Sequence, residues 1–409
     1  MTETIDADWL SGEDARAVTA ALEGAGHQAL FVGGCVRNAL LGVPVTDLDL
    51  STDARPERVM ALAEAAGLKA VPTGIDHGTV TLVHRHHPVE VTTFRADIET
   101  HGRHATVRFS DDVAEDAARR DFTMNALYCD PRGRIVDPLG GLTDLRARRL
   151  RFVGDATARV HEDYLRILRF FRFHAWYADP EGGFDPGGLA ACAEGAEGLD
   201  RISAERIGGE IKKLLAAPDP SRALAAMART GILARVLPGA DATAVARLTA
   251  LEPPRGPAVG PASGPASGPA SGPTTGSSPD AIARLAALGG EEAADRLRLS
   301  KAEAHRVERL RAAATGEAGA AELGWRLGAD DAHAALAIRA ALAAQGLPAG
   351  MAAAVALGAA AEFPVKPADL MPAYEGPALG ARLRQLEAAW IDSGFALDRE
   401  ALLALPDDG

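Results

Sequence analysis

Strand-like patterns occur only in the first 155 or so of the 409 residues, and this asymmetry constrains the fold more than any other feature of the sequence. Four short runs are apolar or alternate in polarity, as strands with a buried face do: Ala29–Val32, Thr46–Ser51, Thr79–His84 and Val89–Phe94. A segment rich in Ala and Glu, Pro56–Ala66, predicts a helix among them. We therefore predict an α+β fold, with a mixed first domain and a helical remainder.

The chain beyond Asp155 carries helical patterns that one low-complexity tract interrupts. Helices are predicted at Glu162–Tyr177, Ser203–Ala216, Pro220–Thr230, Pro279–Ala287, Ala302–Ala313 and over much of Asp330–Ala361. The tract Gly256–Pro273 repeats Gly-Pro-Ala-Ser, which cannot form a helix or bury a core, so we interpret it as a solvated linker. The predicted segments are residues 1–155, 156–250, the linker 251–279, and 280–409.

Composition excludes several classes of protein. The three cysteines lie far apart and one must stay unpaired, so neither a disulfide framework nor a CxxC metal site is available, and we expect a reducing, cytoplasmic setting. No apolar run reaches the roughly 20 residues of a membrane span, and the acidic start lacks the pattern of a signal peptide. The net charge of −13 argues against nonspecific coating of nucleic acid.

The first motif that carries chemistry is Gly33-Gly34-Cys35-Val36-Arg37-Asn38. Two glycines between a predicted strand and a predicted helix let backbone N–H groups approach a phosphate, and the helix N-terminus favours negative charge. Arg37 adds a fork of donors. The motif predicts a triphosphate site at Gly34 and Arg37.

Asp47 and Asp49 follow in the run Thr46-Asp47-Leu48-Asp49. Two positions apart on a strand, their carboxylates project to the same face and can share hard divalent cations with substrate phosphates. An edge strand with two solvated acids is the alternative, but the glycine turn and Arg37 upstream favour a metal site for nucleotidyl transfer.

A third motif, Glu162–Phe173, spaces Asp163, Arg166, Arg169 and Arg172 by three residues, which predicts one stripe on a helix. A solvated face of salt bridges is the alternative. Three arginines beside one aspartate exceed what self-neutralisation needs, which favours an anionic ligand. An Asp acceptor and an Arg donor one turn apart also match the Watson–Crick edge of cytosine or adenine.

The arginines concentrate around these motifs. From Arg119 to Arg172 there are 12 Arg and seven acidic residues, so the acidic excess of the chain lies elsewhere. This distribution limits nonspecific binding of RNA without forbidding specific binding.

Five motifs in order between Leu30 and Phe173 resemble the class II tRNA nucleotidyltransferase and poly(A) polymerase family. They are the Gly-Gly motif with Asp-Leu-Asp, Val89–Arg95, Arg119–Leu127, Asp137–Leu145 and the run from Glu162. The resemblance implies a polymerase-β-like head, a helical neck that selects the base, and a helical body and tail that hold tRNA. It implies a transferase that adds CCA to the 3′ end of tRNA from CTP and ATP, without a membrane partner.

The resemblance also implies roles for individual residues. Mg²⁺ belongs on Asp47 and Asp49, the triphosphate at Gly34 and Arg37, and the nucleotide at Arg120, with Asp121 and Asn125 near the ribose. Asp163 and Arg166 act as the amino-acid template, with Arg169 and Arg172 on phosphate or base. Glu90 is either a third carboxylate at the metals or part of a solvated strand face. Asn38 stands where the family commonly has Asp, so any ion pair there is lost.

Three other functions share these motifs. A poly(A) polymerase is the nearest, although the acidic end of this chain lacks the basic tail expected of one. A CC-only or A-only enzyme is the second, and Asp97–Val107, interpreted as the flexible loop that CC-only enzymes tend to lack, favours full CCA addition. A regulator without catalysis is the third, and the intact aspartate pair argues against it. The sequence leaves the oligomeric state open.

Overall fold

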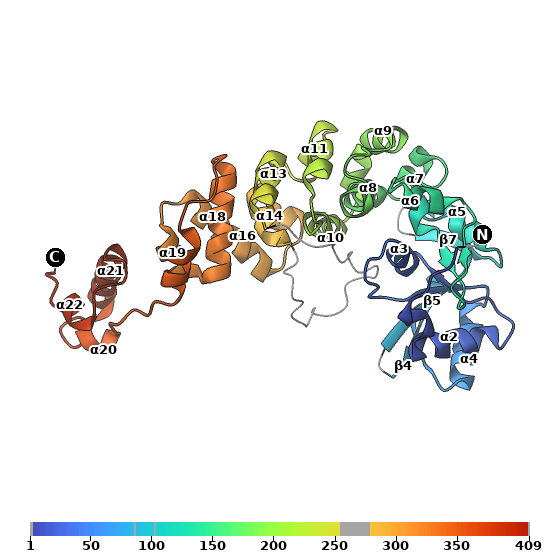
Figure 1. Ribbon diagram of the computed structural model, residues 1–409, viewed down its shortest axis with the longest axis horizontal. Helices are drawn as coiled ribbons and strands as arrows, with labels where there is room; N and C mark the ends of the chain where they lie inside the picture. The colour runs from blue at the N-terminus through green and yellow to red at the C-terminus, as the bar shows by residue number, and fades with distance from the viewer. Residues whose placement is uncertain (1–2, 86, 102–103, 254–278, 408–409) are drawn as a thin grey trace. The chain divides into compact units, whose positions relative to one another are not determined.

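The computed structural model describes residues 3–85, 87–101, 104–253 and 279–407 (Figure 1). Most of the predicted linker, residues 254–278, lies outside this description. The chain divides into two compact units: Met1–Ala242, Pro254–Ala281 and Gly290–Leu299 form the first, and Thr243–Pro253, Ile282–Gly289 and Ser300–Gly409 form the second. The four segments proposed from the sequence stay a prediction.

A mixed sheet of the strand order β3-β4-β5-β2-β1-β8-β9 organises the first unit. Its strands are β1 (Leu30–Val32), β2 (Asp49–Thr52), β3 (Lys69–Gly74), β4 (Thr79–His84), β5 (His87–Thr93), β8 (Tyr128–Cys129) and β9 (Ile135–Val136). β2 and β5 are parallel, with Asp49 opposite Glu90, and the other neighbouring strands are antiparallel. Among the described residues no strand follows β9, which confirms the predicted α+β class.

The rest of the first unit is helical except for one hairpin. Its α-helices are α1 (Asp8–Ser11), α2 (Glu13–Glu23), α3 (Gly34–Leu40), α4 (Pro56–Ala65), α5 (Val113–Ala118), α6 (Gly141–Arg146), α7 (Ala156–Glu162), α8 (Leu165–Tyr177), α9 (Pro186–Glu194), α10 (Ala204–Leu215), α11 (Ser221–Arg229), α12 (Ile232–Val236) and α15 (Ala293–Arg296). Three short 3₁₀ helices occupy Ile75–His77, Thr123–Asn125 and Ala196–Arg201. The helices α2 and α4 pack against β4 and β5, as Figure 1 shows.

Three local predictions are wrong. The strand predicted from Thr46 begins only at Asp49, because the ladder with β5 starts there and leaves Asp47 exposed before it. The segment Asp97–Val107, predicted as a flexible loop, pairs as the antiparallel strands β6 (Arg95–His101) and β7 (His104–Phe109). The helix predicted from Glu162 is broken at Asp163, which has extended backbone angles between α7 and α8.

Aromatic side chains join the strand-containing part of the first unit to its helices. Phe122, in the Arg119–Leu127 motif, packs with its ring centroid 5.0 Å from Phe152 and 5.1 Å from Phe173 of α8. Phe152 in turn stacks on Phe170 of α8 at 5.3 Å. Because these rings are buried or nearly so, α8 is held against the segment that carries Arg120 and Asp121.

All the named secondary-structure elements of the second unit, within its described residues, are helices. It contains α13 (Ala242–Leu251), α14 (Ala281–Leu288), α16 (Lys301–Thr315), α17 (Ala320–Leu327), α18 (Ala329–Leu342), α19 (Met351–Ala359), α20 (Pro367–Leu370), α21 (Gly376–Asp392) and α22 (Arg399–Leu403). Gly358 lets α19 approach α17 closely, since a Cβ there would lie 1.7 Å from the Ala321 carbonyl oxygen. A second core surrounds Trp390 near the C-terminus.

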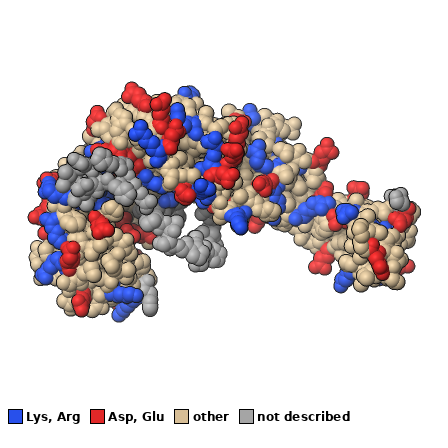
Figure 2. Space-filling view, turned by 180° about the vertical axis from the view of Figure 1, so that it is seen from behind, with Lys and Arg blue, Asp and Glu red and all other residues tan. Residues whose placement is uncertain are grey.

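The surface carries charged side chains of both signs. On the face shown in Figure 2, acidic and basic side chains are interspersed, and neither sign covers it alone. None of the helices in the described ranges has the length and apolar character that a bilayer span requires.

Candidate active site

The Gly-Gly turn connects β1 to α3, as the sequence predicts. Gly33 has a φ of +71°, a left-handed conformation that favours glycine, and Gly34 is the first residue of α3. A Cβ on Gly33 would lie 3.5 Å from the Arg120 guanidinium. The turn therefore exposes its backbone to a cavity that Arg120 also lines.

Arg37 on α3 is a buried cation whose hydrogen-bond partners are all neutral. Its Nε and Nη2 donate to the Asn38 Oδ1 at 3.1 and 2.9 Å, its Nη1 donates to the Asn125 Oδ1 at 2.6 Å, and Nη2 also donates to the Tyr177 hydroxyl at 2.9 Å. Only 3% of Arg37 is exposed, and no described carboxylate forms an ion pair with it. Burial lowers the pKa of Arg37, because a buried charge without a counter-charge is destabilised. The site thus holds positive charge ready for an anion.

Asp49 is the converse case, a negative charge at the same cavity without a cationic partner. Its carboxylate has no ion pair among the described residues, and burial together with the charges of Glu90 and Asp47 raises the pKa of Asp49 to about 6. Glu90 is half-buried directly opposite Asp49 in the β2–β5 ladder, and Asp47 is exposed beside it. Clustered carboxylates that repel one another are stabilised by a hard divalent cation.

The donor set therefore fits a divalent metal ion. Within the described residues no three Asp, Glu, His or Cys side chains are already arranged as a metal cluster, so the role of Glu90 as a third ligand stays a prediction. Two carboxylates are nevertheless sufficient for an ion such as Mg²⁺, which commonly takes one or two from the protein and completes its shell with water and substrate phosphates.

Arg120 is fixed at the cavity by a buried acid that the motifs did not include. Asp116 of α5 accepts hydrogen bonds from Arg120 Nη2 at 3.0 Å and from the Tyr128 hydroxyl at 2.7 Å. Although burial opposes ionisation, Arg120 and Arg119 hold the pKa of Asp116 well below its usual range. Arg120 Nε also donates to the Tyr128 hydroxyl at 3.0 Å. Its guanidinium is thus held in one position, which favours binding of an anion without further ordering.

Arg169 and Arg172 of α8 line the same cavity, each held by an acid from another element. Arg169 Nε donates to Asp121 at 2.8 Å, and Arg172 pairs with the buried Glu210 of α10. Asp121 also accepts from the Asn125 amide at 2.9 Å. Although burial opposes ionisation, Arg169 and Asn125 hold the pKa of Asp121 well below its usual range.

The prediction that the arginines of α8 exceed their acidic partners is therefore wrong. The prediction counted only acids within the motif, whereas Asp121 and Glu210 come from distant parts of the chain. Even so, both arginines lie at the cavity, as the site prediction requires.

Asp163 and Arg166 are placed differently from the prediction of one helical stripe. Asp163 lies before α8, where its Oδ1 accepts from the Leu165 N–H at 3.1 Å and its Oδ2 accepts from Arg206 at 2.6 Å. Such capping of a helix start is a strong preference of Asp. Arg166 pairs with Glu162 and donates to the Arg159 carbonyl at 3.0 Å. Neither residue lines the cavity.

The cavity that unites the other residues has a volume of about 150 Å³. It is lined by the glycine turn, arginines of α3 and α8, and residues of the Arg119–Leu127 motif and α10: Gly33, Gly34, Arg37, Asp49, Arg120, Asp121, Asn125, Arg169, Arg172, Phe173, Tyr177 and Lys213. The sequence reasoning missed Phe173, Tyr177 and Lys213. Tyr177 follows Arg169 and Phe173 at four-residue intervals, a helical signal that could have identified it.

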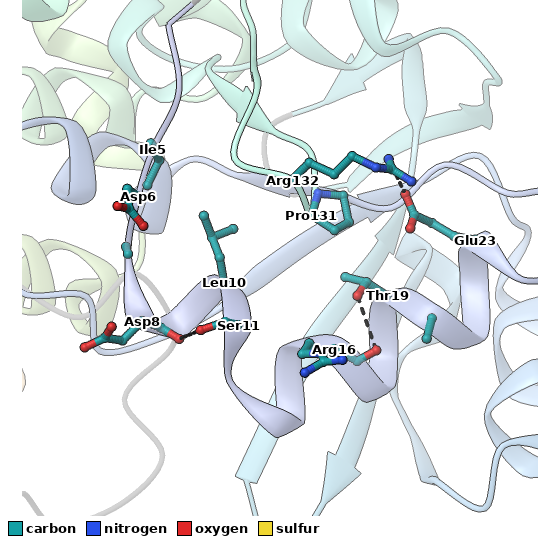
Figure 3. Close-up of a pocket in the computed structure, with 12 residues that line it drawn as sticks. Ile5, Asp6, Asp8, Leu10, Ser11, Arg16, Thr19, Glu23, Pro131 and Arg132 are labelled. Atoms are coloured by element: carbon teal, nitrogen blue, oxygen red, sulfur yellow. Dashed lines mark hydrogen bonds and ion pairs between the residues drawn. The ribbon is translucent and has the colours of Figure 1, made fainter.

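A larger cavity of about 450 Å³ lies elsewhere on the first unit, between the N-terminal segment and α2 (Figure 3). Its charged groups are partly engaged with one another, since Arg132 pairs with Glu23 at 3.5 Å. The Ser11 hydroxyl donates to the Asp8 carbonyl at 3.1 Å. None of the motif residues lines this cavity.

The mixed sheet, the glycine turn and the adjacent carboxylates are those of a nucleotidyltransferase head. Residues 29–151 match the model of the poly A polymerase head domain, and residues 184–243 match that of the probable RNA and SrmB-binding site of polymerase A. These two stretches are thus similar to the class II tRNA nucleotidyltransferase and poly(A) polymerase family, which is a family of metal-dependent nucleotidyltransferases.

Individual relatives show the same likeness. The mitochondrial CCA tRNA nucleotidyltransferase 1 of Homo sapiens is 43% identical over 190 residues, which cover 46% of this chain and 44% of the relative. The CCA-adding enzyme of Geobacillus stearothermophilus is 42% identical over 231 residues, covering 56% and 55%. The chain thus spans about half the length of the curated relatives it matches. A solved Bacillus stearothermophilus CCA-adding enzyme in complex with CTP superposes with a TM-score of 0.72 and 29% identity over 93% of each chain.

Proposed function

We propose that this protein adds CCA to the 3′ end of tRNA, using CTP and ATP without a nucleic-acid template. The charge arrangement of the cavity carries the proposal, since a buried Arg37 without a counter-charge lies in one pocket with an Asp49 without a cation. A nucleoside triphosphate with a divalent metal ion supplies both missing charges. The likeness to CCA-adding enzymes in sequence and fold supports the choice of reaction.

In the proposed reaction the terminal 3′-hydroxyl of the tRNA attacks the α-phosphate of the nucleotide, and pyrophosphate leaves. Arg37, Arg120, Arg169 and Arg172 bind and orient the triphosphate, and the Gly33–Gly34 turn lets the phosphates approach the backbone. Asp47 and Asp49 would hold Mg²⁺, which would lower the pKa of the attacking hydroxyl and offset charge at the phosphate. No covalent enzyme intermediate is required.

We propose that Asp163 and Arg166 read the base despite their protein partners. A carboxylate accepts several hydrogen bonds and a guanidinium donates five, so both keep capacity beyond the contacts with Arg206 and Glu162. An acceptor beside a donor fits the amine and ring nitrogen of cytosine and adenine, whereas guanine and uracil present the reverse pattern.

The proposal assigns parts of the chain to parts of the task. Residues 1–155 carry catalysis, 156–250 select the base and contact RNA, and 280–409 hold the tRNA, with 251–279 as a linker. We also propose Mg²⁺ as the metal and the cytoplasm as the compartment, since the three cysteines are free and buried.

The test supplies the purified protein with Mg²⁺ and a tRNA transcript that lacks its 3′ CCA. CTP alone is expected to extend the transcript by two nucleotides, CTP with ATP by three, and ATP alone by none. Long adenylate tails, or equal extension of unrelated RNA, would contradict CCA addition and indicate a poly(A) polymerase.

Asp49→Ala is the matched variant for the catalytic step. We expect it to abolish incorporation and to leave tRNA binding nearly unchanged, because the carboxylate acts on the reacting phosphate rather than on the bulk of the tRNA. Gel shift measures tRNA binding alongside incorporation. Measurable turnover of this variant with Mg²⁺ would exclude the assigned role of Asp49.

A further inference from the structure

Lys213 of α10 is a cavity residue that belongs to none of the five motifs. α10 packs beside α8 (Figure 1), and the Trp176 indole of α8 donates to the Lys213 carbonyl oxygen at 2.8 Å. This bond fixes the backbone of Lys213 next to the cavity that also contains Gly34, Arg37 and Asp49. The side chain is half-buried, and the residue lines the cavity.

The ammonium of Lys213 makes no hydrogen bond or ion pair with another residue in the described part of the chain. Glu210 lies one turn earlier on the same face of α10, but Arg172 already binds it, and Arg169 lies 4.0 Å from it. Burial lowers the pKa of Lys213; the charge of Glu210 opposes this effect, and Arg172 and Arg169 add to it. A cation in such surroundings is stabilised by an anion that enters from outside.

Some of the cations that line the cavity have an acidic partner within the protein, and others do not. Arg120 is matched by Asp116, Arg169 by Asp121, and Arg172 by Glu210. The lining cations that form no ion pair with a described acid are Arg37 of α3 and Lys213 of α10. A triphosphate carries several negative charges, so it can bind both cations of this one cavity.

From these contacts we propose that Lys213 binds the phosphate chain of the incoming nucleoside triphosphate, together with Arg37. The inference rests on the proposed function, because it names a further ligand of the same substrate. It also predicts which part of the nucleotide Lys213 recognises: the phosphates, and neither the base nor the tRNA primer.

The test compares Lys213→Met with Lys212→Met in the full-length protein. Met keeps the length of the side chain and removes the charge, and Lys212 is the neighbouring lysine that does not line the cavity. Calorimetry with Mg²⁺ measures the dissociation constants of CTP, ATP, CMP and inorganic tripolyphosphate. Lys213→Met is expected to weaken binding of CTP, ATP and tripolyphosphate by about 10- to 100-fold, the usual effect of one charged hydrogen bond.

CMP lacks the β- and γ-phosphates, so its binding is expected to change little, and Lys212→Met is expected to match the unsubstituted protein. Lys213→Arg keeps the charge and is expected to restore most of the affinity, which separates loss of charge from misfolding. Equal weakening of CMP and CTP, or a change confined to the KM for tRNA, would overturn the inference. An unsubstituted protein that binds no CTP or ATP would instead contradict the proposed function itself.

Discussion

Two buried arginines, one in each compact unit, differ in whether a carboxylate neutralises them. Arg284 of α14 is 0% exposed, and its Nε and Nη2 donate to the two carboxylate oxygens of Glu252 at 3.0 and 2.6 Å. Arg37 of α3 is 3% exposed and donates to amide and phenol oxygens alone. Arg284 therefore has its counter-charge within the protein, and Arg37 does not.

The difference separates a structural cation from a binding cation. Removing one member of a buried ion pair leaves the other charge unpaired, which costs stability in the folded protein. A buried cation held by neutral groups already bears its desolvation cost in the free protein, and an anionic ligand relieves it. Arg37 is therefore expected to affect nucleotide binding more than folding, and Arg284 the reverse.

The largest expected effect is that of Arg37→Met. Loss of a fixed charged donor at the triphosphate is expected to lower kcat/KM for CTP by about 100- to 1,000-fold. The free energy of unfolding is expected to change less than in Arg284→Met, because relief of the buried charge offsets part of the lost hydrogen bonding. Steady-state kinetics and urea unfolding check the two expectations. A loss of activity that only follows a loss of stability would make Arg37 a structural residue.

Arg284→Met is expected to destabilise the second unit by about 3 kcal/mol, because Glu252 would keep its charge without its bidentate partner. Thermal unfolding followed by circular dichroism measures this change. At a temperature where the variant stays folded, KM for CTP is expected to match the unsubstituted protein.

The double variant Arg284→Met with Glu252→Leu provides the control for Arg284→Met. It is expected to recover part of the stability, since it removes the carboxylate together with its Arg284 partner. An unchanged unfolding temperature in the single variant would show that the Arg284–Glu252 pair contributes nothing to the second unit.

Local patterns were sufficient to predict the strand and the helix on either side of the Gly-Gly turn. The predicted strand at Ala29–Val32 and the helix after it correspond to β1 and α3, with the glycine turn between them. Both depend on residues adjacent in sequence, where apolar periodicity and glycine have direct conformational effects. The break at Asp163 was missed because capping competes with helix continuation at that residue.

The partners of the site residues could not be predicted in the same way. Tyr177 binds Arg37 across 140 residues of sequence, and Glu210 binds Arg172 across 38. Such contacts depend on how α8 and α10 pack, which no local pattern records. The prediction of excess positive charge on α8 failed for this reason, although uncompensated charge does occur at Arg37.

Asn38→Asp sharpens the comparison by giving Arg37 the kind of partner that Arg284 has. The Asn38 Oδ1 already accepts two hydrogen bonds from the Arg37 guanidinium, so a carboxylate in the same place forms a buried ion pair. The substitution also removes the hydrogen bond that the Asn38 amide donates to the Pro44 carbonyl oxygen at 3.2 Å, which offsets part of the gain. We expect the free energy of unfolding to rise by about 1 kcal/mol and the affinity for CTP to fall by a few fold, because the new charge competes with the triphosphate.

Calorimetry with CTP and urea unfolding measure both effects of Asn38→Asp, and Asn38→Ala separates them from simple loss of the amide. Asn38→Ala removes the acceptor without adding charge, so it is expected to lower stability and to leave the positive charge of Arg37 available to the nucleotide. If Asn38→Asp binds CTP more tightly than the unsubstituted protein, uncompensated charge at Arg37 does not drive binding. The two arginines would then differ in how they pack, and charge compensation would not explain their different roles.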